Sequence, residues 1–148
     1  MRIEKIIDEI VNSENNFEES IGNFDILTEK MDDNFTPYRI EQSVMMWINE
    51  EGVLGEIECI FPEQVNDEIT LISSKIVREQ NGFPIININE KISFSCNEVL
   101  VFAGDDYFVL YFTNTKVYDV KIISQNLVFY LFNSELIAIK AMVLGNKL

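Results

Sequence analysis

Tyr107-Phe108-Val109-Leu110-Tyr111-Phe112-Thr113 is the stretch that decides the fold. Its odd- and even-numbered positions are both apolar or aromatic, so a strand here is buried on both faces and lies centrally in a sheet. Three further candidate strands flank it: Glu98–Ala103, Val117–Ile123 and Leu127–Phe132. Short turns rich in Gly, Asp and Asn separate them, which predicts an antiparallel meander in a sandwich, in a barrel or under a helix.

A long hairpin is predicted upstream of the meander. Tyr38–Ile48 and Val53–Phe61 are its candidate strands, and residues 49–52 form the turn, with Gly52 able to take positive φ. A register that pairs Val44 with Ile57 places most of the apolar residues on one face and a mixed set on the other. We expect the apolar face, which includes Cys59, to be buried.

A second hairpin is predicted from Ile69–Gln80 and Phe83–Asn89, because Asn81-Gly82 between them is the strongest short hairpin signal. Pro84 makes the returning strand an edge strand or a bulged one.

Helices are predicted at the two ends of the chain. Residues 2–11 carry Ile and Val at the spacing of an amphipathic helix. Residues 134–144 fit either a helix capped by Ser134 or a final strand, and we favour the helix. The predicted fold class is α+β and β-rich: antiparallel hairpin and meander sheets, as a sandwich or partly open barrel, with an N-terminal helix and possibly a C-terminal helix. Residues 1–148 are expected to form a single domain.

The negative charge is unevenly distributed. The chain has a net charge of −14, yet residues 1–68 hold 18 acidic and 4 basic residues, whereas residues 69–148 hold 7 of each. A field of this sign repels nucleic acid and anionic membranes, so neither is an expected partner. It attracts a basic protein and speeds the encounter, although solubility alone is an equally good explanation.

The residues needed for several common chemistries are missing. The chain has no histidine, which excludes Ser–His and Cys–His nucleophile pairs, and it has no phosphate-binding glycine motif. Cys59 and Cys96 are too few for a structural zinc site, and we expect both to be buried thiols in the core. We therefore expect neither an enzyme nor a cofactor nor a metal site. The mixed charges of the first residues lack the apolar run of a secretion signal, which indicates a cytoplasmic protein.

The mixed face of the first hairpin is the most suggestive feature. On the predicted register Met45, Trp47 and Leu54 cluster there. An apolar anchor with an acidic surround suits a basic protein partner. The predicted N-terminal helix could also cover this face, so we favour burial of Trp47 beneath it. The candidate partner-binding residues are Glu41, Trp47, Glu50, Glu51, Glu56 and Glu58.

The stretch Gly55-Glu56-Ile57-Glu58-Cys59-Ile60-Phe61-Pro62-Glu63 adds to a wider family resemblance. In length, acidity, strand content and lack of a catalytic set, the chain resembles small acidic immunity proteins of bacterial polymorphic and contact-dependent toxin systems. The resemblance implies a cytoplasmic protein that binds one toxin tightly and blocks it.

Two other binding functions stay open. Acidic side chains could mimic nucleic-acid phosphates and inhibit a DNA- or RNA-binding enzyme. A β-barrel could instead hold a small apolar ligand, and the aromatic residues that could line such a cavity are Tyr107, Tyr111, Phe129 and Tyr130.

Overall fold

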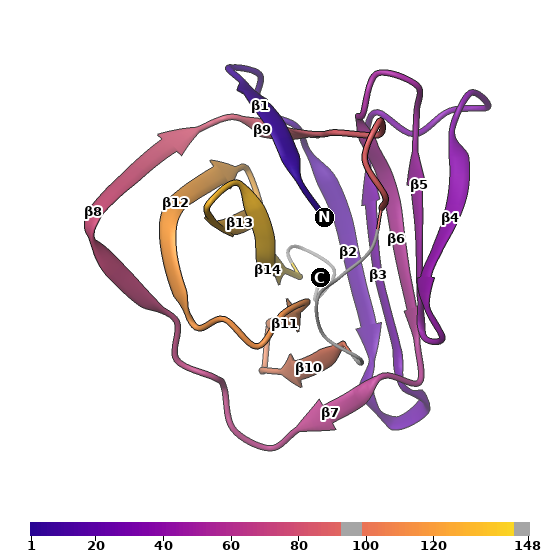
Figure 1. Ribbon diagram of the computed structural model, residues 1–148. Coiled ribbons are helices and arrows are strands. Elements are labelled where there is room, and N and C mark those ends of the chain that lie inside the picture. The colour runs from indigo at the N-terminus through magenta and orange to yellow at the C-terminus, as the bar shows by residue number, and fades with distance from the viewer. Residues whose placement is uncertain (93–98, 144–148) are drawn as a thin grey trace.

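The computed structural model describes residues 1–92 and 99–143, and within them the chain forms three β-sheets and one short 3-10 turn, η1 (Glu19–Ile21) (Figure 1). The five-stranded sheet has the order β2 (Ser13–Glu18), β3 (Asn23–Thr28), β6 (Leu54–Ile60), β5 (Val44–Ile48), β4 (Thr36–Glu41). The seven-stranded sheet has the order β7 (Glu63–Val65), β10 (Leu100–Ala103), β11 (Tyr107–Tyr111), β14 (Glu135–Met142), β13 (Leu127–Phe132), β12 (Val117–Ser124), β8 (Ile72–Asn81). The two-stranded sheet pairs β1 (Ile3–Ile7) with β9 (Phe83–Ile86).

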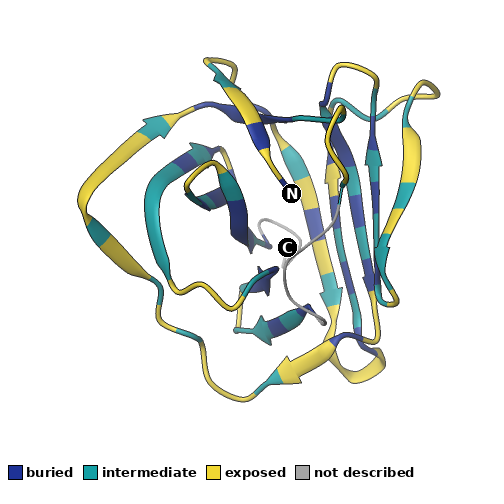
Figure 2. Cartoon of the chain, in the orientation of Figure 1, coloured by how far each residue is buried: buried dark blue, intermediate teal, exposed yellow. Residues whose placement is uncertain are grey.

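The main core lies between the two large sheets. Phe24 on β3 meets Phe108 on β11 with ring centroids 5.4 Å apart, and both side chains are fully buried. Along β5, buried residues alternate with partly exposed ones, which is the period of a strand with one face on the core (Figure 2). The two sheets therefore pack as a sandwich, and β11 has the central, doubly buried place that its sequence predicts.

The seven-stranded sheet curls away from the five-stranded one. Its edge strands β7 and β8 are consecutive in sequence and are joined by residues 66–71, which we call the strap. Six strand spacings of about 4.8 Å amount to about 29 Å, more than the strap's seven steps of about 3.6 Å can cover. The sheet must therefore curl, and Figure 1 shows the strap at the lower left, running from β7 to β8 outside the other strands of the sheet.

The prediction of α+β is wrong, because the described residues contain no α-helix. Residues 2–11, predicted as a helix, begin with β1, in which Ile3 pairs with Ile86. The β-branched residues that fit the helical stripe also favour a strand, and pairing with β9 decided between the two. Val11 follows the strand and is fully buried, where its backbone N–H donates to Ser124 Oγ at 2.7 Å.

The C-terminal helix is also wrong, because this segment forms β14 between β11 and β13. Ser134 does not cap a helix. Asn133 and Ser134 take φ of 50° and 66° and form the two-residue turn between Phe132 and Glu135. Two successive positive φ angles are the mark of a type I′ hairpin turn. As a strand, this segment forms backbone hydrogen bonds with β11 on one side and β13 on the other. A helix could not form these bonds with the sheet.

The predicted hairpin at Asn81-Gly82 does not form. β8 pairs in parallel with β12, and β9 pairs with β1. Gly82 has φ of 152° and lies so close to β1 that a Cβ atom would be 2.3 Å from the Ile7 carbonyl oxygen. Gly82 allows the chain to pass from the seven-stranded sheet to the two-stranded sheet. The Asn-Gly pair by itself does not distinguish such a crossing from a hairpin turn.

The first hairpin is confirmed in its faces and corrected in its details. Residues 38–48 are two strands, β4 and β5, joined by a turn at Gln42 and Ser43. Val44 pairs with Cys59, two residues from the predicted partner, so the side chains of residues 44–48 and 56–60 keep their predicted faces. Leu54 and Phe61 do not: Leu54 is buried and Phe61 is exposed. Cys96, Glu98 and Leu144, which also carried predictions, lie outside the described residues. No described helix has the length and hydropathy to cross a membrane.

Candidate functional site

Three carboxylates and several apolar side chains share the outer face of the five-stranded sheet. The strand period turns Asp25 and Leu27 of β3 outward while Phe24 and Ile26 point to the core. Asp25 lies opposite Glu58 of β6, and Glu58 lies opposite Met45 of β5. The next row is Leu27, Glu56 and Trp47. We call this surface the acidic face; it consists of Asp25, Leu27, Met45, Trp47, Glu56, Glu58 and Ile60.

The surroundings of the acidic face disfavour the charged forms of Asp25 and Glu56. Partial burial, and then the nearby charge of Glu58, raise the pKa of Asp25 above its ordinary value. Partial burial also raises the pKa of Glu56, with smaller contributions from Glu58 and Asp25. Asp25 Oδ1 is shielded from solvent and accepts no hydrogen bond from any described group. Each of these effects makes the charged form less stable than in water.

No cation among residues 1–92 and 99–143 forms an ion pair with Asp25, Glu56 or Glu58. Arg39 stands opposite Met45 on the same side of the sheet, but its guanidinium donates to the Gln42 carbonyl oxygen at 3.0 Å. The acidic face therefore keeps an uncompensated negative charge.

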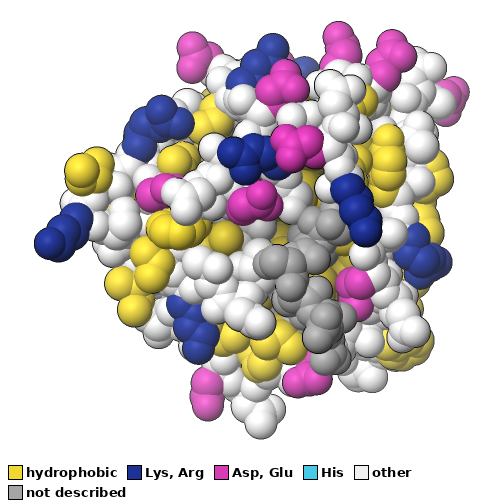
Figure 3. Space-filling model, in the orientation of Figure 1, with side chains coloured by type: hydrophobic (Ala, Val, Ile, Leu, Met, Phe, Trp, Pro, Cys, Tyr) yellow, Lys and Arg dark blue, Asp and Glu magenta, His cyan; other side chains and the backbone are white. Residues whose placement is uncertain are grey.

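An exposed apolar corner borders the acidic face at the end of β6. Ile60 is 44% exposed, Phe61 is 76% exposed and Ile21 of η1 is 54% exposed. Phe61 has a positive φ of 54°, and its backbone N–H donates to the Gly22 carbonyl oxygen at 2.7 Å. Figure 3 also shows hydrophobic side chains at the surface over β4 and β5, on the right-hand side. Exposed apolar groups beside uncompensated carboxylates are a combination that protein-binding surfaces use.

Of the six predicted site residues, the structure brings Trp47, Glu56 and Glu58 together. Trp47 is half-buried among its sheet neighbours, and the helix expected to cover it does not exist. Leu54, predicted on this face, is buried in the core because a bulge next to Trp47 pairs it with Ile48. Thr28 Oγ1 lies 2.8 Å from the Leu54 carbonyl oxygen in this bulge.

The other three predicted residues lie at the two ends of β5. Glu50 and Glu51 are exposed in the loop to β6, where the Asn49 side chain accepts hydrogen bonds from two backbone N–H groups. Glu41 lies at the opposite end, where its carboxylate accepts hydrogen bonds from the backbone and hydroxyl of Ser43. Five residues of strand span about 17 Å. Glu50 and Glu51 can border the acidic face, whereas Glu41 is tied into its own turn.

Asp25 and Leu27 are site residues that the sequence analysis missed. The signal was present in part, because residues 23–26 alternate polar and apolar positions, although Leu27 and Thr28 break the pattern. Their proximity to Glu56 and Glu58 depends on the pairing of β3 with β6, which are far apart in sequence.

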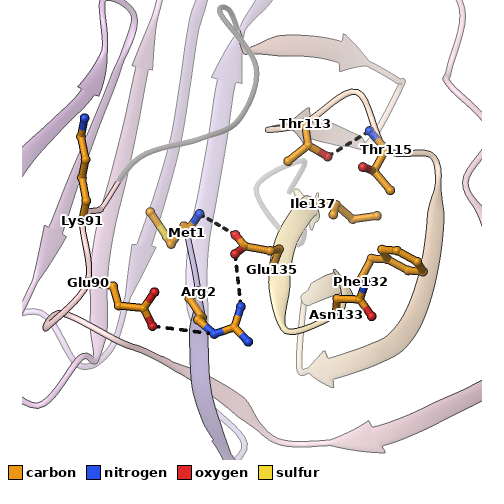
Figure 4. Close-up of a pocket in the computed structure, with 10 residues that line it drawn as sticks. All are labelled: Met1, Arg2, Glu90, Lys91, Thr113, Thr115, Phe132, Asn133, Glu135 and Ile137. Carbon is orange, nitrogen blue, oxygen red and sulfur yellow. Dashed lines mark hydrogen bonds and ion pairs between the residues drawn. The ribbon is translucent and has the colours of Figure 1, made fainter.

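A hollow of about 450 Å³ lies elsewhere, where β1 passes the start of β14 (Figure 4). Arg2 lies between two carboxylates in it, 3.4 Å from Glu135 and 3.7 Å from Glu90. The Met1 amino group lies 3.0 Å from the second oxygen of Glu135. These opposite charges satisfy one another, so the cluster ties β1 to β14.

Cys59 is fully buried on the core side of β6. Burial first, and then the charge of Glu41, raise the pKa of its thiol to about 12. It is therefore a packing residue, since a reactive thiol needs a lowered pKa. No group of His, Cys, Asp and Glu side chains in the described ranges is arranged to hold a metal ion.

Comparisons with known proteins assign the chain to no family. No family model matches it, and a search of curated protein sequences found no significant match.

Proposed function

We propose that this chain is a non-enzymatic binding protein that captures a basic protein partner on the acidic face and blocks it. The uncompensated row of Asp25, Glu58 and Glu56 is the observation that supports this proposal most strongly. These carboxylates do not stabilise the unbound protein, because partial burial and nearby negative charges raise the pKa values of Asp25 and Glu56. Lys or Arg side chains of a partner would relieve that repulsion on binding.

The apolar groups supply the second part of the mechanism. Long-range attraction by the acidic half of the chain would speed the encounter, and burial of Trp47, Leu27 and Ile60 would then slow dissociation. Glu50 and Glu51, at one border of the face, would contribute mainly to the association rate.

Within this class we propose an immunity protein that acts in the cytoplasm on a toxin domain. The acidity of residues 1–68, the lack of histidine and the paired charges of the hollow at Arg2 support a blocking role over a catalytic one. The target would be a protein with a basic cleft, whose access the acidic face would close.

The test is capture of a partner from host lysate by tagged wild-type protein and by matched charge reversals. Glu56→Lys/Glu58→Lys changes the acidic face, whereas Glu4→Lys/Asp8→Lys makes the same change in net charge on exposed residues near β1. We expect one basic protein to be retained at high salt by the wild type and the control, and to be lost with the first variant. Retention by the first variant contradicts the site.

The immunity proposal has its own readout. Expression of the captured protein alone should arrest growth, and co-expression of the wild-type chain should restore it. Co-expression with Trp47→Ala should restore growth less well, because the anchor is shortened. A captured protein that is harmless when expressed alone would retain the binding function and refute the immunity role.

A further inference from the structure

A second hollow lies on the opposite side of the molecule from the acidic face, between the strap and the curled seven-stranded sheet. It measures about 320 Å³, and the residues that line it include Tyr111, Tyr118, Tyr130, Val109, Glu68 and Lys140. Pockets of this size hold small organic molecules of one or two rings. The proposed partner-binding function makes no use of it.

The strap forms one wall of this hollow and is fixed to the sheet. Tyr111 Oη accepts a hydrogen bond from the Ile69 backbone N–H at 3.1 Å and lies 3.2 Å from the Ile69 carbonyl oxygen. The Tyr107 hydroxyl donates to the Glu68 carboxylate. Ile69 and Leu71 pack against the apolar cluster of the sheet. The hollow is therefore held open between two fixed walls.

Aromatic rings dominate the lining. Tyr118 and Tyr130 meet edge to face, with centroids 5.0 Å apart and an interplanar angle of 74°. Because the two rings are nearly perpendicular, an aromatic ligand can stack on the face of one and contact the other with its edge. Burial first, and then the nearby Tyr118, raise the pKa of Tyr130, and burial raises that of Tyr111 to about 12. Both hydroxyls stay protonated at neutral pH; that of Tyr111 donates to the Ile69 carbonyl oxygen, and that of Tyr130 can donate to a ligand.

The cations around the hollow decide the charge of its ligand. Lys140 Nζ lies 4.4 Å from the centroid of the Tyr107 ring, and Lys121 Nζ lies 5.9 Å from that of Tyr130. Of the aromatic rings that line the hollow, Tyr130 is therefore already faced by an ammonium group. Lys121 pairs with Glu79 at 3.8 Å, whereas Lys140 forms no ion pair within residues 1–92 and 99–143. Lys140 is thus the cation that can bind an anion.

The long-range field does not oppose an anion here. The excess acidity belongs to residues 1–68, whereas residues 69–148, which supply most of the lining, are neutral overall. Figure 3 shows Lys and Arg side chains spread among the carboxylates over the seven-stranded sheet. At physiological salt, charges more than about 8 Å apart are largely screened.

We propose that this hollow binds a small aromatic anion, with its ring stacked on one of Tyr118 and Tyr130 and in edge contact with the other, and with its carboxylate or similar group on Lys140. Glu68, the other charged residue of the lining, accepts a hydrogen bond from the Tyr107 hydroxyl, whereas Lys140 has no ion pair within residues 1–92 and 99–143. The hollow therefore suits an anionic ligand better than an aliphatic cation. The ligand class is defined by this chemistry: a planar one- or two-ring body with one anionic group.

The test uses three naphthalene probes that differ in charge: 2-naphthoate, 2-naphthalenemethanol and (2-naphthylmethyl)trimethylammonium. Binding to the wild-type protein is measured by NMR titration of the amide signals of the strap and of β13. We expect naphthoate to bind about tenfold more tightly than the neutral alcohol, the size of one charge-assisted hydrogen bond, and the cation to bind most weakly. Equal affinity of the three probes, or no binding of naphthoate, would overturn the proposal.

Matched variants identify the anion's partner. Lys140→Met removes the ammonium group and keeps most of the stem, while Lys75→Met makes the same change on exposed β8 outside the hollow. Naphthoate affinity should fall about tenfold in the first variant and stay unchanged in the second. The alcohol should bind all three proteins alike, which shows that the hollow is intact. A Lys140→Met variant that keeps the wild-type preference for naphthoate would refute the assignment.

Discussion

Asp25 and Glu58 stand directly opposite each other on β3 and β6, with both side chains on the outer face of the sheet. Like charges in this relation destabilise a sheet by a few tenths to about 1 kcal/mol. Asp25→Asn should therefore raise the free energy of unfolding at pH 7 by about 0.5 kcal/mol. Urea titrations at pH 7 and at pH 3 measure the difference.

The pH dependence of that gain has a defined sign. Because folding raises the pKa of Asp25 above its ordinary value of 3.8, the folded protein loses stability as pH rises through this range. The gain in unfolding free energy from Asp25→Asn should vanish below about pH 3.8, where Asp25 is protonated in both the folded and the unfolded wild-type protein. Asp33→Asn, in an exposed loop, is the control and should change little at either pH. A gain at pH 3 equal to that at pH 7 would refute the charge explanation.

Gly82→Ala should destabilise the protein by roughly 1–3 kcal/mol, because its positive φ and the nearby Ile7 carbonyl leave no room for a methyl group. Asn81→Ala, one residue earlier and exposed, should cost much less. An Asn-Gly hairpin turn would make both residues important, since it requires positive φ at each. Thermal unfolding of the two variants shows whether residues 81–82 form a crossing between two sheets or a hairpin turn.

The thiol of Cys59 should be inert in the folded protein. Its raised pKa of about 12 and complete burial leave almost no accessible thiolate at pH 8. In a Cys96→Ser background, labelling by a disulfide exchange reagent should be at least a hundredfold slower in buffer than in 6 M guanidinium chloride. Equal rates would show that β6 opens readily or that the thiol is not in the core.

The sequence predicted local strands well where the period of two was strong. β13 matches its predicted bounds, and β11 is buried on both faces as its apolar run requires. The faces of β5 and of residues 56–60 in β6 were also correct, because a shift of two residues leaves a side chain on the same side, whereas the bulge next to Trp47 turned Leu54 to the core.

The errors arose where tertiary pairing overrode a local signal. A stripe of Ile and Val suits both a helix and a strand, and β1 became a strand because β9 was available to pair with it. Asn81-Gly82 is typical of a hairpin turn, but the glycine is required because the backbone of Ile7, far away in sequence, packs closely against it. The candidate site was half predictable for the same reason: Glu56, Glu58 and Trp47 come from one hairpin, whereas Asp25 joins them through a pairing between distant strands.

Tyr111→Phe should release the strap while leaving the sheet folded. The substitution removes only the hydroxyl, so the Ile69 backbone N–H loses its partner at 3.1 Å and the ring keeps its packing. Loss of this contact should cost about 1–2 kcal/mol of global stability. Amide hydrogen exchange of residues 66–71 should accelerate more than that of β13, because the strap opens locally.

Tyr118→Phe is the control, since its hydroxyl has no hydrogen bond to the strap in the described structure. It should leave exchange in residues 66–71 unchanged. If Tyr111→Phe accelerates exchange in the strap and weakens naphthoate binding together, the strap is the wall that shapes the hollow. Faster exchange spread evenly over β11, β13 and the strap would instead show that Tyr111 stabilises the whole sheet and holds no local closure.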